Sequence, residues 1–251
     1  MENAGMRYWE ALKSVLESTV ISQIAAIQQA AEVVARALAA GRRLYIYDTG
    51  HMLNRELVNR AGGLVAMTPL QFELTLDNTI AEEPERERPK STEEEIRGYV
   101  NYALTQADIQ RGDVVIIGSV TGSRVFLVEV ALQMKSRGIA LIGLTSKEYS
   151  AFAPVQHSAG KKLSDICDVL IDNGCVVGDA MLSIHGLDVP VGPASGISAA
   201  TLMWMLCAEI VERQIALGKM PLVLESMNLP GAMDRNRDKA LQYLAGLNGQ
   251  L

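Results

Sequence analysis

Residues 114–124 read VVIIGSVTGSR and carry two signals of an α/β fold. The first four form a short run of β-branched apolar side chains, which is typical of a strand buried on both faces. A loop rich in Gly, Ser and Thr follows at 119–123, and residues 124–136 are apolar at helical spacing, with Gly138 as the expected C-terminal cap. The stretch therefore predicts a buried strand, a tight loop and a helix.

The same unit recurs earlier in the chain. Residues 44–47 form a short apolar run, Asp48-Thr49-Gly50 supplies a turn, and 51–61 has a helical pattern. Short strands that alternate with helices imply parallel βαβ units. Further strands are expected at 64–67, 140–144 and 169–172. We therefore predict a three-layer α/β/α fold around a sheet of about five parallel strands.

The flanking segments complete this expected organisation. Residues 1–40 repeat apolar side chains every three or four positions, which predicts one or two amphipathic helices that pack on a main domain at 41–251. Residues 199–217 predict a long apolar helix, and 234–247 an amphipathic one. The charged stretch 82–95, EEPERERPKSTEEE, is expected to be a surface loop. The apolar run at 197–211 is interpreted as too short to span a membrane.

Composition limits the partners and the compartment. The chain has 23 Lys and Arg against 29 Asp and Glu, so its net charge of −6 argues against nucleic-acid binding. Its three cysteines fit no disulfide framework or zinc ribbon, and the N-terminal residues lack the apolar stretch of a signal peptide. These features predict a cytoplasmic protein. Neither a Walker A loop nor a GxGxxG fingerprint is present, so we expect no nucleotide cofactor.

The loop at 118–124 has the composition of a phosphate site. It places the hydroxyls of Ser119, Thr121 and Ser123, and the glycine Gly122, directly before a helix. Backbone N–H groups converge at the amino end of a helix and favour a dianion. Arg124 adds a guanidinium. The alternative is that Ser123 simply caps the helix.

Several segments resemble the SIS (sugar isomerase) superfamily, in particular a bacterial branch of phosphosugar-binding proteins related to sedoheptulose-7-phosphate isomerase. Ser119-Val120-Thr121-Gly122 resembles the S-x-S-G phosphosugar loop of that superfamily. The other matching segments are 60–64, 156–163, 168–174, 178–180 and 226–237. The resemblance implies a sugar phosphate ligand and a homodimer, or a higher homo-oligomer, with a shared site. Arg124 stands where many members have threonine, and the 48–53 loop is shorter than in this branch.

The resemblance also implies candidate catalytic residues. Isomerisation of an aldose to a ketose needs a base that moves a proton between adjacent carbons, and a second group that shuttles protons on the oxygens. Glu56 resembles the catalytic glutamate of the heptose isomerase, although an ion pair with Arg60 would equally explain it. His51 and His157 are the candidate shuttles, with His185 a weaker alternative in an expected turn or hairpin.

Other polar residues near the expected strand ends and loops are candidate ligand contacts. The alternatives for them are helix capping and solvation. They are Thr49, Gly50, Thr145, Ser146, Ser158, Lys161 and Ser195. The heptose isomerase has a metal-binding histidine on its late helix, whereas residues 195–211 contain none, so we expect no metal.

Three functions remain open from the sequence. The first is a phosphosugar isomerase that works through an enediol. The second is a non-catalytic protein that binds or senses a phosphosugar. The third is a lyase or etherase that acts on a phosphorylated amino sugar, because that chemistry also begins with proton abstraction beside a carbonyl.

Overall fold

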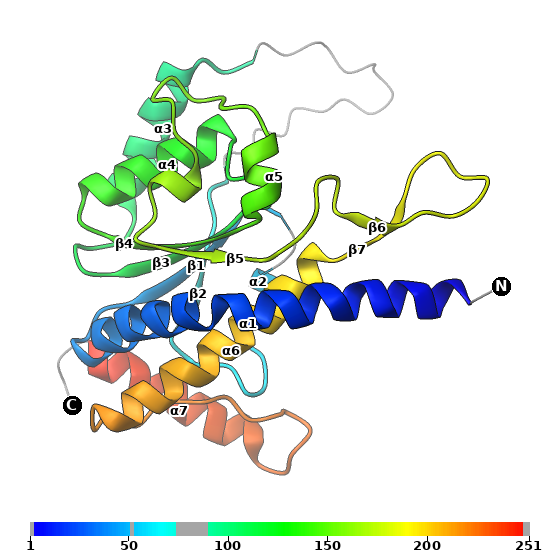
Figure 1. Cartoon of the computed structure of the whole chain (residues 1–251). Helices are drawn as coiled ribbons and strands as arrows, with labels where there is room; N and C mark the ends of the chain where they lie inside the picture. Colours follow the sequence, from blue (N-terminus) through cyan, green and yellow to red (C-terminus); the bar gives the residue numbers. More distant parts are fainter. Residues whose placement is uncertain (1–2, 51–52, 74–89, 248–251) are drawn as a thin grey trace, which may run out of the picture.

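The computed structural model describes residues 3–50, 53–73 and 90–247. At its centre lies a parallel sheet of five strands in the order β2-β1-β3-β4-β5 (Figure 1). The strands are β1 (Leu44–Asp48), β2 (Met67–Leu70), β3 (Val114–Gly118), β4 (Ala140–Thr145) and β5 (Val169–Asp172). Helices cover both faces, which confirms the predicted three-layer α/β/α fold.

The sheet is buried on both faces because successive side chains of a strand point in opposite directions. In β1, Leu44 and Ile46 pack into one apolar cluster with helices α1 (Ala4–Ala39) and α6 (Ser195–Ala216). Tyr45 and Tyr47 face the other cluster, formed with helices α3 (Glu93–Gln106) and α4 (Val125–Ser136). Each central strand therefore needs apolar side chains at nearly every position, as the sequence has.

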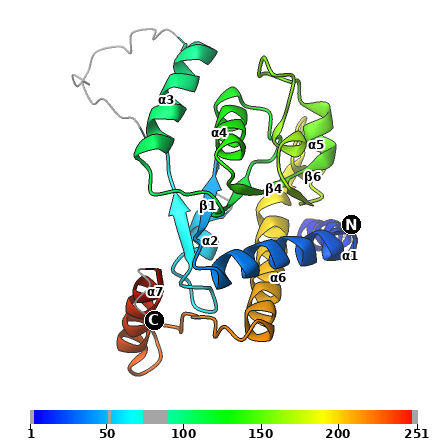
Figure 2. The same ribbon diagram turned by 90° about the vertical axis from the view of Figure 1, so that its left-hand side faces the viewer.

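The first layer is built on a long contact between α1 and α6 (Figures 1 and 2). The Asn3 side chain caps α1 by accepting a hydrogen bond from the Gly5 amide at 2.8 Å. Ala30, Ala31 and Val34 are fully buried, and such small side chains let the helix axis approach its neighbours closely. The expected one or two helices at 1–40 are thus one continuous helix.

Helix α6 corrects the expectation that its apolar run is too short for a membrane. It has 22 residues and is long and apolar enough to cross a bilayer by length and composition. Several of its apolar side chains pack inside the protein: Leu202, Leu206 and Ile210 are buried in the core. The fold therefore accounts for the apolar sequence of α6.

The second layer holds α3, α4 and α5 (Lys147–Phe152). Part of the charged stretch, expected to be a loop throughout, is the first turn of α3. The Thr92 hydroxyl accepts from the Glu95 amide at 3.2 Å, and the Glu95 carboxylate accepts from the Thr92 amide at 2.7 Å. This capping box starts a helix despite the surrounding charge. Residues 82–89 of that stretch lie outside the described residues.

Two expected elements after β1 are shifted. Instead of a helix at 51–61, the structure has the short α2 (Asn54–Leu57), because Asn59 adopts a positive φ of 54° and leaves the helical conformation. The strand expected at 64–67 is β2 at 67–70. The preceding segment pairs elsewhere: the Gly62 amide donates to the Leu224 carbonyl, and the Leu224 amide donates to the Gly63 carbonyl, both at 2.8 Å.

The remaining elements lie around the sheet. A 3-10 turn η1 (Leu163–Asp165) precedes β5, and β6 (Ala180–Leu182) pairs with β7 (Val191–Pro193) as a separate antiparallel hairpin. His185 lies between these two strands, as predicted. Helix α7 (Ala232–Leu247) follows and docks on the 222–225 segment, where Asn236 exchanges hydrogen bonds with the backbone of Glu225.

Acid should weaken the attachment of α7. Hydrogen bonds from Arg235 and then Lys239 hold the pKa of Glu225 at about 2, below its ordinary 4.5. The carboxylate therefore contributes stability that is fully present above about pH 4.5 and is lost as the pH falls towards 2. We expect Glu225→Gln to remove this component of the pH dependence of the unfolding free energy, measured by urea titration between these pH values. Glu10→Gln, on the exposed face of α1, is the control, and identical profiles for the two variants would contradict the assignment.

Candidate functional site

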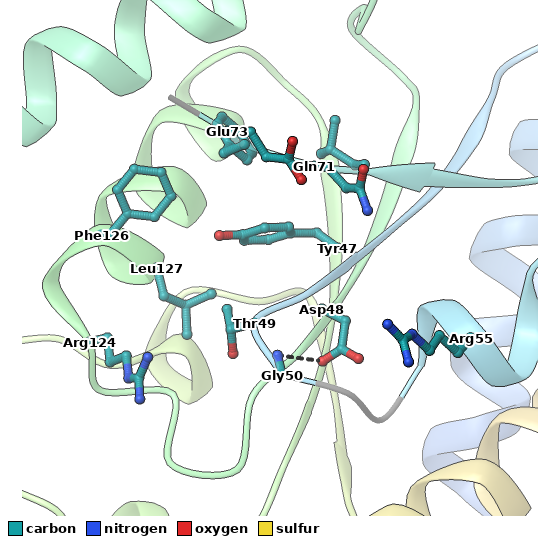
Figure 3. Close-up of a pocket in the computed structure, with 12 residues that line it drawn as sticks. Tyr47, Asp48, Thr49, Gly50, Arg55, Gln71, Glu73, Arg124, Phe126 and Leu127 are labelled. Carbon is teal, nitrogen blue, oxygen red and sulfur yellow. Dashed lines mark hydrogen bonds between the residues drawn. The ribbon is translucent and has the colours of Figure 1, made fainter. Parts of the chain in front are cut away.

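A pocket of about 700 Å³ lies at the carboxyl edge of the sheet (Figure 3). Its walls come from the end of β1, the start of α2, the end of β2 and the start of α4. The lining residues are Tyr47–Gly50, Arg55, Leu70–Glu73, Arg124, Phe126 and Leu127. The strands β1 and β3 are neighbours in the sheet. From β1 the chain continues to β2 on one side of this pair, and from β3 it continues to β4 on the other side. Ligands of open α/β sheets bind at such a reversal point.

The loop after β1 is held largely by side chains that bond to backbone groups. The Asp48 carboxylate accepts hydrogen bonds from the amides of Gly50 at 3.1 Å and Leu53 at 2.6 Å. The amide and the hydroxyl of Thr49 both donate to the Gly118 carbonyl at 3.1 Å. Thr49 and Gly50 thus reach the pocket, as the predicted ligand contacts should, on a loop tied to β3. Their contact with a ligand stays a prediction.

The loop after β3 is braced by its own hydroxyls. The Ser119 hydroxyl accepts from the Gly122 amide at 3.3 Å, and the hydroxyls of Thr121 and Ser123 lie 3.1 Å apart. Ser119 and Ser123 are buried. The N-terminal cap of α4 is Arg124, without a side-chain capping bond, so the alternative that Ser123 caps this helix is wrong.

Helix α4 points its amino end at the pocket. The first hydrogen bond within the helix runs from the Val128 amide to the Arg124 carbonyl. The amides before Val128 therefore have no acceptor within the helix. Phe126 and Leu127 from this turn line the pocket together with the exposed Arg124. A guanidinium and the positive end of a helix therefore meet at one wall, an arrangement suited to an anion.

Two predicted hydroxyls at the end of β4 support these loops and do not line the pocket. Thr145 and Ser146 are fully buried. The Thr145 hydroxyl donates to the Val120 carbonyl at 2.7 Å, and the Ser146 hydroxyl donates to the Cys175 carbonyl at 2.6 Å. Thr145 thus fixes the loop after β3, and Ser146 ties the end of β4 to the segment after β5. Direct ligand contact by either residue finds no support in this geometry.

Ser195 is engaged in the same way at the start of α6. Its hydroxyl donates to Asp179 at 2.5 Å, and its amide donates to the other oxygen of that carboxylate at 2.9 Å. Asp179 itself has a positive φ of 57°. A carboxylate therefore occupies the positive end of α6, where Ser195 was the predicted ligand contact.

Glu56 lies beside the pocket but is not among its lining residues. Its carboxylate accepts a hydrogen bond from the Trp204 indole nitrogen at 3.2 Å and pairs with Arg60 at 3.1 Å. The ion pair with Arg60 is the alternative that the sequence left open. Its side chain is one-third exposed. The other candidate on this segment, His51, lies outside the described residues.

The structure places His157 away from the pocket, in a buried network between α3 and α4. Its Nε2 lies 3.0 Å from the Glu129 carboxylate, and its Nδ1 accepts from the Ala159 amide at 3.0 Å. The adjacent Ser158 hydrogen-bonds Glu93 through its amide and its hydroxyl. Lys161 is exposed outside the pocket lining. These three residues are not brought together with Thr49, Gly50 and Arg124.

Sequence reasoning missed the aromatic wall of the pocket. Tyr47 and Phe72 pack edge to face with ring centroids 5.3 Å apart, and Phe72 and Phe126 do so at 5.6 Å. Burial raises the pKa of Tyr47 to about 12, which keeps its phenol protonated. Phe72 follows β2 and reaches the pocket because that strand lies three residues later than expected. A strand predicted at 67–70 would have placed Phe72 at the pocket.

The described residues give little basis for metal binding or for a nucleophilic thiol. Within residues 3–50, 53–73 and 90–247, no three His, Cys, Asp or Glu side chains are grouped so that they could hold a metal ion. Burial raises the pKa of Cys167 to about 11 and that of Cys175 to about 12. Both thiols therefore stay protonated near neutral pH and are poor nucleophiles.

The fold and the pocket define a class: an α/β/α domain with a pocket at the β1/β3 reversal point. A family model described as the SIS domain matches residues 7–146, more than half of the chain. The chain belongs to the SIS family.

Three other proteins are similar to this chain. The UPF0309 protein of Halalkalibacterium halodurans is 33% identical over 233 residues, which cover 92% of this chain and 90% of that protein. Another UPF0309 protein, from Geobacillus sp., is 32% identical over 94% of each chain. The phosphoheptose isomerase of Neisseria gonorrhoeae superposes with a TM-score of 0.50 at 16% identity, covering 82% of this chain and 96% of that one. That similarity shows a common fold.

The loop geometry predicts unequal effects of two glycine substitutions. Gly122 and Gly160 both have a positive φ, of 63° and 66°, so alanine at either is strained by roughly 1 kcal/mol. A Cβ at Gly122 would also lie 2.9 Å from the Leu163 Cβ, whereas at Gly160 it meets nothing within 4 Å. We expect Gly122→Ala to lower the unfolding free energy by about 1–3 kcal/mol more than Gly160→Ala, measured by urea unfolding. Equal losses would show that the loop relaxes freely.

Proposed function

We propose that this protein binds a sugar phosphate in the pocket at the carboxyl edge of the sheet and isomerises it between aldose and ketose. The observation that carries the proposal is the meeting of Arg124 and the amino end of α4 at the reversal point of the sheet. Membership of the SIS family and the fold shared with a phosphoheptose isomerase support it.

In this proposal the phosphate lies at the start of α4. The first-turn amides of the helix and the Arg124 guanidinium bind its oxygens, because both favour a dianion. The 119–123 loop, with Ser119, Thr121, Gly122 and Ser123, shapes the backbone around it, and the hydroxyl-bearing loop at Thr49 and Gly50 faces the sugar. The aromatic wall of Tyr47, Phe72 and Phe126 excludes water from the pocket.

For catalysis, we propose Glu56 as the base and His51 as the proton shuttle. The base removes the proton from the carbon next to the carbonyl, and returns it to the neighbouring carbon after the enediol forms. Glu56 must turn from Trp204 and Arg60 to reach the sugar, and its one-third exposure leaves room for this. We leave His157 out of the mechanism because its buried ring is bonded to Glu129 and to the Ala159 amide.

A second function, binding without turnover, is favoured by one specific observation. The Glu56 carboxylate is bound on both oxygens by Trp204 and Arg60, and it is not a lining residue of the pocket. A protein that only senses the sugar phosphate needs no such base. The two functions share the phosphate site and differ in the fate of the ligand.

We further propose that the protein is a cytoplasmic homodimer or larger homo-oligomer. Helix α1 exposes the apolar side chains of Met6, Trp9, Ile21 and Ile24, which a second copy would bury. The described cysteines are all unpaired thiols, in agreement with a reducing compartment.

Arg124→Ala tests the phosphate site. We expect its affinity for C4 to C7 sugar phosphates to fall about tenfold or more, the effect of losing a charged hydrogen bond, with little change for the free sugars. Thermal-shift titration measures both, because a ligand that binds the folded state raises its Tm. Arg36→Ala, on the exposed end of α1, is the matched control. Equal losses for phosphorylated and free sugars would rule out the phosphate assignment.

Glu56→Gln separates the two functions. The amide keeps the shape of the side chain but cannot accept the proton, so we expect turnover to fall at least about 100-fold. Binding of the sugar phosphate should change less than about twofold. NMR of the bound sugar measures the isomer that forms. If the wild-type protein binds sugar phosphates without forming any product, the isomerase proposal fails and the binding function remains.

A further inference from the structure

A second cavity, of about 410 Å³, lies at the amino edge of the sheet, opposite the first pocket. Its walls are the end of α1, the segments just before β1 and β2, the end of α6 and the last turns of α7. Leu38, Leu64 and Leu222 give it an apolar lining. It shares no lining residue with the pocket proposed for the sugar phosphate.

Two polar atoms at this cavity have no hydrogen-bond partner among the residues that the structure describes. They are the Oε1 of Gln214, a residue only 9% exposed, and the hydroxyl of Tyr243. Across the described part of the chain, three buried side-chain nitrogen or oxygen atoms are unpartnered in this way, and these are two of them. Buried polar groups in folded proteins nearly always have a partner. Their concentration at one cavity therefore indicates a missing occupant.

The two cations at the cavity also lack carboxylate partners within the described part of the chain. Arg42 and Lys219 line it, and neither has a carboxylate within 4 Å among residues 3–50, 53–73 and 90–247. Nearby cations do have such partners: Arg43 pairs with Asp108, and Lys239 with Glu225. Both residues are exposed and bring two positive charges to one cavity, which favours an anionic group there.

We propose that this cavity is a second ligand-binding site, which takes a small amphipathic anion that carries a hydrogen-bond donor. The anionic group faces Arg42 and Lys219, the apolar body packs on the leucines, and the donor reaches the Gln214 Oε1. The Tyr243 hydroxyl supplies a further hydrogen bond. Burial raises the pKa of Tyr243 to about 12, so this hydroxyl is protonated at neutral pH.

Three small probes separate these features. 4-Hydroxyphenylacetate has the anion, the apolar ring and the donor; phenylacetate lacks the donor, and tyramine replaces the anion with a cation. We expect saturation-transfer NMR on the full chain to detect 4-hydroxyphenylacetate most strongly and phenylacetate with about tenfold lower affinity. Tyramine should show no saturation transfer. The measurement contains no sugar phosphate, so its outcome does not depend on the function proposed for the first pocket.

Two variants locate the binding. Lys219→Glu should weaken 4-hydroxyphenylacetate about tenfold, whereas Lys13→Glu, on the exposed face of α1, should not change its affinity. Gln214→Leu should reduce 4-hydroxyphenylacetate to the affinity of phenylacetate and leave phenylacetate unchanged. If Gln214→Leu does not fold, the Lys219→Glu comparison and the probe series still decide. Absence of saturation transfer from every probe, or equal affinities in the wild type and Lys219→Glu, would overturn the proposal.

Discussion

The pairing of β1 with β3 is the constraint on which the site depends. The two strands run parallel in register from Leu44 opposite Val114 to Asp48 opposite Gly118, so their carboxyl ends finish side by side. The chain then turns away from β1 and β3 in opposite directions, since β2 and β4 lie on the two outer sides. The loops that follow β1 and β3 diverge, and the space between them forms the pocket.

The same loops must stay rigid although they lack the hydrogen bonds of a sheet. Side chains supply these bonds: Asp48 accepts from two amides, and the hydroxyls of Thr49 and Thr145 donate to carbonyls of the β3 end and its loop. Residues that look like ligand contacts in the sequence are thereby used to hold the backbone. What remains available to an anion is largely the amino end of α4 and the Arg124 guanidinium.

The sequence predicted those parts of the fold in which local pattern and burial agree. Continuous apolar runs located β1, β3, β4 and β5 within a residue or two, because strands buried on both faces tolerate few other residues. It failed for β2, whose position depends on pairing between residues 62–65 and 222–224, far apart in the chain. It likewise failed to place His157, because this residue lies in the connection after α5 and its partner Glu129 lies on α4, 28 residues earlier in the chain. Side-chain partners of this kind are set by tertiary packing, which spacing along the chain does not encode.

The contact between α1 and α6 also governs the time at which this protein completes its core. About 155 residues of chain separate the end of α1 from the start of α6. At a synthesis rate of roughly 5–20 residues per second, the apolar face of α1 waits on the order of ten to thirty seconds for its packing partner. During that interval Ile27 and Val34 are exposed to other chains and to chaperones. The sequence separation between α1 and α6 thus leaves the nascent chain prone to aggregation until α6 has been synthesised.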